Sequence, residues 1–188
     1  MSISIRFARL EDARDLLEIY TPYIEKSAIT FEYDVPSLKE FTERMRSVKS
    51  FYPYLVAEED GQILGYAYAS AFRPRAAYAW SVEVTVYLDE NARGKGVGRK
   101  IYNVLEAYLK KMGILNLNAC IASTDMEDEY LSNGSEKFHA ALGYALVGKF
   151  HQSGYKFNRW YDMIWMEKIL GEHTANAASV KSIQEIID

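Results

Sequence analysis

The sequence predicts one mixed α/β (α+β) domain, with helices on both faces of a largely antiparallel sheet of six to seven strands. Segments with strand and helix periodicity follow one another in the order βααβββαβαββ. No internal repeat or linker divides the first 170 residues of the 188-residue chain, which is a length that one domain can fill. We expect a single domain over residues 1–170 and a C-terminal tail, weakly helical, over residues 171–188.

The N-terminal elements are one strand and two helices. Residues 1–9 alternate between apolar and polar types and carry charges, which predicts a strand rather than a signal peptide. Residues 11–25 place apolar side chains at helical spacing. An aromatic loop follows over residues 30–34, and Pro36 and Ser37 open a second helix that runs to about residue 48.

The middle of the chain reads as three strands. Residues 54–58 and 63–72 flank the pair Asp60 and Gly61, a typical hairpin turn. A third strand over residues 79–88 is rich in β-branched residues.

The C-terminal half predicts two helices and three strands. We expect a helix over residues 101–112, a strand over 115–122, a turn over 124–129, a short helix over 135–142 and a closing hairpin of strands 144–155 and 160–169. Gly113 and Gly143 stand where helices commonly end.

Charge and composition restrict the possible partners. The formal net charge of −4 disfavours nucleic acid as a ligand. No apolar run approaches the roughly 18 residues of a membrane span, so we expect a cytoplasmic protein without a membrane partner. Cys120 is the single cysteine, which excludes an internal disulfide and favours a reducing compartment. It lies in a strand that reads as half-buried, so we expect it to pack rather than react. No Cys or His spacing, His151 included, makes a metal site.

The segment RGKGVGRK at residues 93–100 is a candidate phosphate site. It lies between a strand and a helix, and its alternate glycines let backbone N–H groups approach a ligand closely. The spacing fits neither a dinucleotide fingerprint nor a Walker loop, which requires Ser or Thr after Gly-Lys. The alternative is a glycine-rich turn whose basic residues form no site.

Read as Arg-x-x-Gly-x-Gly, this segment resembles the pyrophosphate loop of the GNAT acetyltransferase superfamily. The resemblance implies the GNAT fold, acetyl-CoA as co-substrate, and cofactor contacts from Arg93, Gly94, Lys95, Gly96, Val97, Gly98 and Arg99. Up to about residue 169 the chain also resembles the phosphinothricin acetyltransferase family, through residues 28–31, 52–58, 75–80, 83–87 and 138–144. That family implies acetyl transfer to the amino group of a small amino-acid-like acceptor, usually in a homodimer.

Glu83 is the candidate general base. Alternation along the strand places three valines on one face and Ser81, Glu83, Thr85 and Tyr87 on the other. Burial raises the pKa of such a carboxylate toward neutrality, which suits it to remove a proton from an ammonium group. The resemblance implies the same role. The alternatives are a solvated strand face or an ion pair with Arg73 or Arg75.

His139 occupies the position where many GNAT enzymes carry a tyrosine that protonates the departing thiolate. A histidine pKa near 6.5 allows the same role. The alternative is a histidine hydrogen-bonded near the cofactor. The resemblance further implies that backbone N–H groups of Val86, Tyr87 and Leu88 polarise the thioester and hold the cofactor arm, and that Asn133 and Ser135 contact the cofactor.

The residues that match the family's acceptor pocket are Phe31, Arg73, Arg75, Tyr78 and Tyr87. Arginine binds carboxylates and phosphinates well. Ordinary packing is the alternative for each aromatic residue. Residues 150–162 depart from the herbicide-detoxifying relatives, and they are placed to line the acceptor end or a dimer contact.

Three functions compete. The first is an amino-acid N-acetyltransferase. The second is an acetyltransferase of protein N-termini or polyamines, in which the acidic segment 127–129 meets a cationic acceptor. The third is a non-catalytic acetyl-CoA sensor.

Overall fold

The computed structural model describes residues 3–187, and its elements follow the expected order. They are β1 (Ser4–Phe7), α1 (Ala13–Lys26), α2 (Leu38–Lys49), β2 (Tyr54–Glu59), β3 (Gln62–Ala71), β4 (Ser81–Leu88), α3 (Val97–Met112), β5 (Asn116–Ser123), α4 (Gly134–Ala141), β6 (Ala145–Lys156), β7 (Arg159–Ile169) and α5 (Gln184–Ile187). Three short 3-10 turns, η1 (Leu10–Asp12), η2 (Ala76–Tyr78) and η3 (Glu90–Ala92), join some of them. The mixed α/β class is confirmed.

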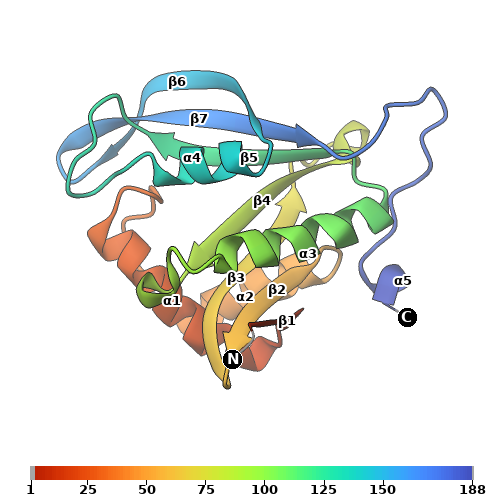
Figure 1. Ribbon diagram of the computed structural model, residues 1–188, viewed down its shortest axis with the longest axis horizontal. Helices are drawn as coiled ribbons and strands as arrows, with labels where there is room; N and C mark the ends of the chain where they lie inside the picture. Colours follow the sequence, from red (N-terminus) through yellow and green to blue (C-terminus); the bar gives the residue numbers. More distant parts are fainter. Residues whose placement is uncertain (1–2, 188) are drawn as a thin grey trace.

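The seven strands form one sheet in the order β1-β2-β3-β4-β5-β7-β6. Every neighbouring pair is antiparallel except β4 and β5, which run parallel. Their pairing extends only from Ser81 opposite Asn116 to Glu83 opposite Asn118. Beyond that point the two strands diverge and leave a split in the sheet (Figure 1).

The helices cover both faces of the sheet (Figure 1). On one face, α3 packs on strand residues such as Leu55 and Ala67. On the other face, α1 and α2 cover the residues of opposite alternation, including Val56 and Tyr66. Successive side chains of β2 and β3 therefore point to opposite faces of the sheet and form two separate hydrophobic cores, one under each helical layer.

Helix α3 begins four residues earlier than expected, at Val97 instead of residue 101. The reason is Gly96, which occupies the left-handed region with φ +77° and serves as the N-cap. Glycine adopts this conformation without steric cost. The glycine loop is consequently shorter than the sequence pattern indicates, and Val97 and Gly98 belong to the first helical turn.

The segment after β7 runs beside the C-terminal end of α3 (Figure 1), where the N–H of Lys181 donates to the carbonyl of Met112 at 2.9 Å. The Trp80 indole donates to the carbonyl of Ala178 at 2.8 Å, and the side chains of His173 and Asn116 are 2.8 Å apart. Ile183 is only 3% exposed and belongs to the core beneath α3. Of this segment, Gln184–Ile187 is helical. Within residues 3–187, no helix has the length and apolar character to span a membrane.

Candidate active site

A cavity of about 230 Å³ lies in the split between β4 and β5. Residues 83–87 of β4 form one wall and residues 119–122 of β5 form the other. The turn after α1 contributes Ile29, Thr30 and Phe31, and the helical side contributes Tyr102, Ser135 and His139. The sheet split therefore brings Glu83 and His139, two predicted catalytic residues, to one cavity.

Among the described residues that line this cavity, Glu83 alone carries a carboxylate. Its pKa is raised by burial, an effect that the nearby charge of Arg73 partly opposes. Within residues 3–187 no basic side chain forms an ion pair with it. The ion-pair alternative therefore finds no support, and the geometry leaves the carboxylate free to accept a proton.

Cys120 also lines the cavity, and its side chain is exposed rather than packed as the sequence suggested. Its neighbours Ala119 and Ile121 point into the core beneath α3. Alternation along β5 therefore turns Cys120 to the opposite face, where it borders the split. Although the residue is exposed at the surface of the cavity, the surrounding walls partly desolvate its thiol, and this together with the charge of Glu83 raises the pKa to about 11, so the thiol is protonated at neutral pH.

His139 is buried and forms a hydrogen-bonded pair with Tyr102. Its Nδ1 lies 2.8 Å from the carbonyl of Ser135, and its Nε2 lies 3.0 Å from the Tyr102 hydroxyl. Because a carbonyl only accepts, Nδ1 carries the proton, and Nε2 accepts from Tyr102. Burial lowers the pKa of His139 and raises that of Tyr102, so both groups are neutral near pH 7. Both line the cavity.

The glycine loop leads directly from β4 into α3. Gly94 and Gly96 both have positive φ, while Arg93, Lys95 and Arg99 are exposed. Val97 is buried, so its side chain belongs to the core and its backbone alone is available to a ligand. Gly98 packs so closely that an added Cβ would lie 3.1 Å from the Phe138 ring. The first N–H groups of a helix have no intrahelical acceptor, and this turn presents them beside three cations.

The edge of β4 that faces the split is uncovered by β5 beyond Glu83. The N–H of Leu88 donates to the Tyr23 hydroxyl oxygen at 3.1 Å, so this N–H points away from β3. Alternation places the N–H of Val86 on the same side. Val86 and Tyr87 line the cavity, whereas Leu88 lies beyond it.

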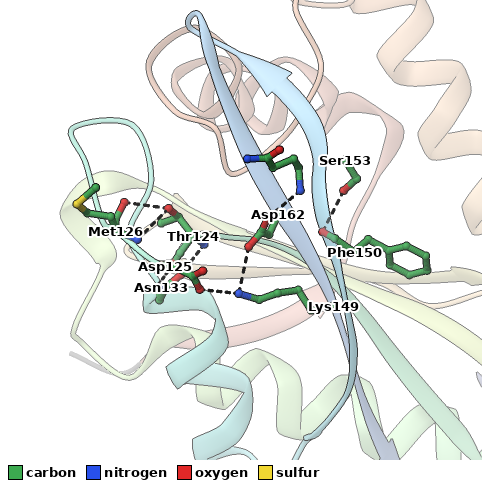
Figure 2. Close-up of polar contacts among 9 residues, drawn as sticks. Thr124, Asp125, Met126, Asn133, Lys149, Phe150, Ser153 and Asp162 are labelled. Atoms are coloured by element: carbon green, nitrogen blue, oxygen red, sulfur yellow. Dashed lines mark hydrogen bonds and ion pairs between the residues drawn. The ribbon is translucent and has the colours of Figure 1, made fainter.

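Asn133 and Ser135 occupy different positions at the start of α4. Ser135 lines the cavity. The side chain of Asn133 instead bonds to both backbone groups of Thr124, accepting from N–H at 3.2 Å and donating to C=O at 2.8 Å (Figure 2). This amide joins the end of β5 to the start of α4 and so fixes the position of the helix that carries His139.

The acidic segment after β5 is tied to the β6–β7 hairpin by ion pairs. Lys149 lies 2.7 Å from Asp125 and 3.1 Å from Asp162, and Asp162 accepts from the N–H of Gln152 (Figure 2). Arg159 lies 2.8 Å from Asp128 and 2.9 Å from Glu129. These carboxylates are thus partnered within the chain.

The residues matched to an acceptor pocket fall into three places in the structure. Phe31 and Tyr87 line the cavity. Arg73 stacks over Phe72, at 4.3 Å from the ring centroid, and is close enough to Glu83 to affect its pKa. Arg75 and Tyr78 are exposed around η2 and do not line the cavity.

Sequence reasoning missed Tyr102, Thr30 and Ser132, all of which line the cavity. Tyr102 stands in the apolar stripe of α3, where a core role is the ordinary interpretation. Its place in the second turn after the glycine loop, where the helix borders the cofactor side, is the signal that could have identified it.

Comparisons with known proteins agree with this geometry. A family model described as an acetyltransferase (GNAT) domain matches residues 5–165. A phosphinothricin N-acetyltransferase of Alcaligenes faecalis is 34% identical, covering 89% of this chain and 82% of its own. An L-methionine sulfoximine/L-methionine sulfone acetyltransferase of Salmonella typhimurium is 30% identical, covering 92% and 98%. A GNAT phosphinothricin acetyltransferase from Sinorhizobium meliloti, solved in complex with acetyl-CoA, superposes with a TM-score of 0.84 at 36% identity, covering 94% and 92%.

Proposed function

The chain belongs to the GNAT superfamily of acetyltransferases and to its phosphinothricin acetyltransferase-like branch, and we propose that it acetylates the primary amine of a small amino-acid-like acceptor. The donor is acetyl-CoA, and the acceptor is of the phosphinothricin, methionine sulfone or methionine sulfoximine type. The observation that carries the proposal is the position of Glu83, an unpaired carboxylate of raised pKa on the wall of the cavity in the sheet split.

Acetyl-CoA binding is assigned to the glycine loop and the free edge of β4. The first N–H groups of α3 and the cations Arg93, Lys95 and Arg99 suit the pyrophosphate. The N–H of Val86 faces the split, where it can donate to the pantetheine arm or to the thioester carbonyl. A donor there stabilises the negative charge that develops on that oxygen during attack.

Glu83 removes a proton from the acceptor ammonium, directly or through water. Its raised pKa brings its basicity closer to the operating pH, which favours proton transfer. The neutral amine then attacks the thioester carbonyl and the C–N bond forms. As the C–S bond breaks, the nitrogen loses its second proton to give the amide, and the departing thiolate gains one proton.

We assign the proton transfer to the departing thiolate to the hydroxyl of Tyr102, which the second proton lost by the nitrogen restores. Both members of the Tyr102–His139 pair are neutral near pH 7, and the Tyr102 O–H is the proton shared between them. Ser135 holds the imidazole through its carbonyl, which fixes the tautomer that accepts from Tyr102. His139 therefore acts together with Tyr102 rather than as an isolated imidazolium.

A cytoplasmic homodimer is the expected form of the enzyme. Support comes from the edge strand β6 and its neighbour β7, which expose Leu146, Val147, Phe150 and Trp160 at 56% to 60% of their surface. An edge strand with exposed apolar side chains offers unpaired backbone groups and apolar surface to a second copy of the chain. Sedimentation or light scattering at micromolar concentration tests the dimer.

The experiment that tests the function measures acetyl-CoA-dependent thiol release. The acceptors are phosphinothricin, L-methionine sulfone, L-methionine sulfoximine, the free amino acids, spermidine and a peptide with a free N-terminus. Selective turnover of an amino acid or analogue is the expected result.

The panel also separates the competing functions. Preference for spermidine or the peptide would replace the proposed acceptor class by a cationic or protein acceptor. Acetyl-CoA binding by calorimetry without turnover of any acceptor would contradict the enzymatic proposal and favour a sensor.

A further inference from the structure

Three segments that are distant in the sequence meet at the end of the cavity formed by Ile29, Thr30 and Phe31. They are the turn after α1, the segment before α4, and the tip of the β6–β7 hairpin. Residues 29–31 belong to an irregular turn, so their position depends on what holds that turn.

Lys156, the last residue of β6, reaches into this turn. Its Nζ donates to the carbonyl of Ser27 at 2.8 Å and to the carbonyl of Thr30 at 2.8 Å. The two acceptors flank Ala28 and Ile29, so a single ammonium closes the turn from inside. Ser27 is also the C-cap of α1, where a cation interacts favourably with the negative end of the helix dipole.

The lysine is 2% exposed, and within residues 3–187 it forms no ion pair with a carboxylate. A buried ammonium is costly unless it is hydrogen-bonded, and buried carbonyls have the same requirement. The partners of Lys156 are two carbonyls of this turn. Its Nζ also lies 5.2 Å from the centroid of the Phe157 ring, and the charge of Glu32 acts on it without forming an ion pair. The hydrogen bonds of the buried ammonium therefore serve the turn.

Two further contacts press the same turn against the hairpin. A Cβ on Gly154 would lie 2.3 Å from the Phe31 ring, so the ring rests directly on the hairpin backbone. The Phe157 ring stacks on Tyr130 at 4.1 Å, and the carbonyl of Tyr130 accepts from the N–H of Ala28. Phe157 has φ +52°, a conformation that bulky residues seldom adopt, so tertiary contacts hold this hairpin tip in its shape.

We propose that Lys156 is a positioning residue for the acceptor: by binding the carbonyls of Ser27 and Thr30, it fixes the wall of residues 29–31 against which the acceptor packs. The assignment of this wall to the acceptor rests on the proposed function. The glycine loop and the free edge of β4 lie elsewhere, so acetyl-CoA binding does not depend on Lys156.

The test compares Lys156→Met, which keeps the chain length but donates nothing, with Lys149→Met. Lys149 lies on the same strand and contacts Asp125 and Asp162 instead of the turn (Figure 2). Acetyl-CoA and L-methionine sulfoximine are varied separately in steady-state kinetics. We expect Lys156→Met to raise the KM for L-methionine sulfoximine at least tenfold, with the KM for acetyl-CoA and the kcat within twofold of wild type. The Lys149→Met variant should leave all three within twofold.

A second readout does not depend on the acceptor. Amide hydrogen exchange over residues 28–31 should be faster in Lys156→Met and unchanged in Lys149→Met. An unchanged exchange rate, or a proportional loss of acceptor and acetyl-CoA parameters together, would overturn the proposal. If wild-type protein acetylates another amino-acid-like acceptor of the panel instead, that acceptor replaces L-methionine sulfoximine in the kinetics. If it acetylates none of them, the proposed acceptor class fails, while the exchange measurement still decides whether Lys156 holds the turn. If Lys156→Met does not fold, Gly154→Ala takes its place, because the added Cβ displaces Phe31 from the hairpin side. This variant must likewise raise the KM for L-methionine sulfoximine and leave the KM for acetyl-CoA unchanged.

Discussion

Replacing Glu83 by glutamine removes the proton acceptor of the cavity while keeping the shape of the side chain. Glu83 is the carboxylate among the cavity-lining residues described, so no neighbour can take over its task. Without a base, only the neutral fraction of the acceptor amine reacts. An amine with a pKa between about 8 and 10.4, the range from an α-amino group to a lysine side chain, is roughly 10% to 0.04% neutral at pH 7.

The expected loss of kcat/KM at pH 7 is therefore about 10-fold for the most acidic amine of this range and about 2 × 10³-fold for the most basic, which overlaps the usual contribution of a general base, about 10²–10⁴-fold. The assay is thiol release between pH 6 and pH 9.5. The loss should shrink about tenfold for each pH unit, because the concentration of neutral amine rises by that factor below its pKa. Wild-type turnover should instead fall only as the pH drops through the raised pKa of Glu83. A variant with unchanged turnover at pH 7, or with the wild-type pH profile, would refute the reasoning.

Stability provides the control for Glu83→Gln. Burial raises the pKa of Glu83, so the folded state binds this proton more tightly than the unfolded state does. Stability then decreases as the pH rises through the interval between the unfolded and the folded pKa, and the ionised carboxylate is a cost at neutral pH. The neutral amide avoids that cost. We expect the Tm of the variant at pH 7.5 to equal or exceed that of wild type, which separates lost chemistry from lost folding.

Three further predictions concern the Tyr102–His139 pair, the glycine loop and the C-terminal tail. His139→Ala leaves Tyr102 without its hydrogen-bond partner, so kcat should fall at least tenfold while the Kd for acetyl-CoA from calorimetry changes less than threefold; a loss confined to that Kd would favour a cofactor-binding role instead. Gly96→Ala places a Cβ at φ +77°, which costs about 1–2 kcal/mol and should raise the KM for acetyl-CoA but not for the acceptor; equal KM values in variant and wild type would exclude a role in phosphate binding. Ile183→Ala removes a side chain that is 3% exposed and should cost about 2–5 kcal/mol in urea unfolding, with both KM values unchanged; a cost below about 1 kcal/mol would contradict its place in the core.

The fold could be predicted from the sequence because its signals are local. Period-2 and period-3.6 patterns located the strands and helices to within a few residues, and capping residues such as Ser37 and Gly113 marked helix ends correctly. The one larger error, at the start of α3, arose because Gly96 can serve either as loop or as N-cap, and sequence alone does not give its φ.

The site could be predicted only in part because its remaining residues act through long-range contacts. Cys120 and its buried neighbours form a continuous apolar run, and which face of β5 meets solvent depends on where the sheet splits. Tyr102 reads as an ordinary core residue until His139 is placed beside it. Lys156 reads as a surface lysine at a hairpin end, because its two acceptors lie 126 and 129 residues away.

The point at which β4 and β5 part explains why Glu83 has its properties. Glu83 is the last residue of β4 in register with β5, opposite Asn118. One residue earlier, at the position of Val82, the carboxylate would point into the core beneath α3 instead. At the junction it is buried enough for its pKa to rise and open enough to border the cavity. The tail strengthens the paired end of the same junction, since it contacts Trp80 just before β4 and Asn116 at the start of β5. The short pairing thus fixes where the split begins, and with it the basicity and the access of the candidate base.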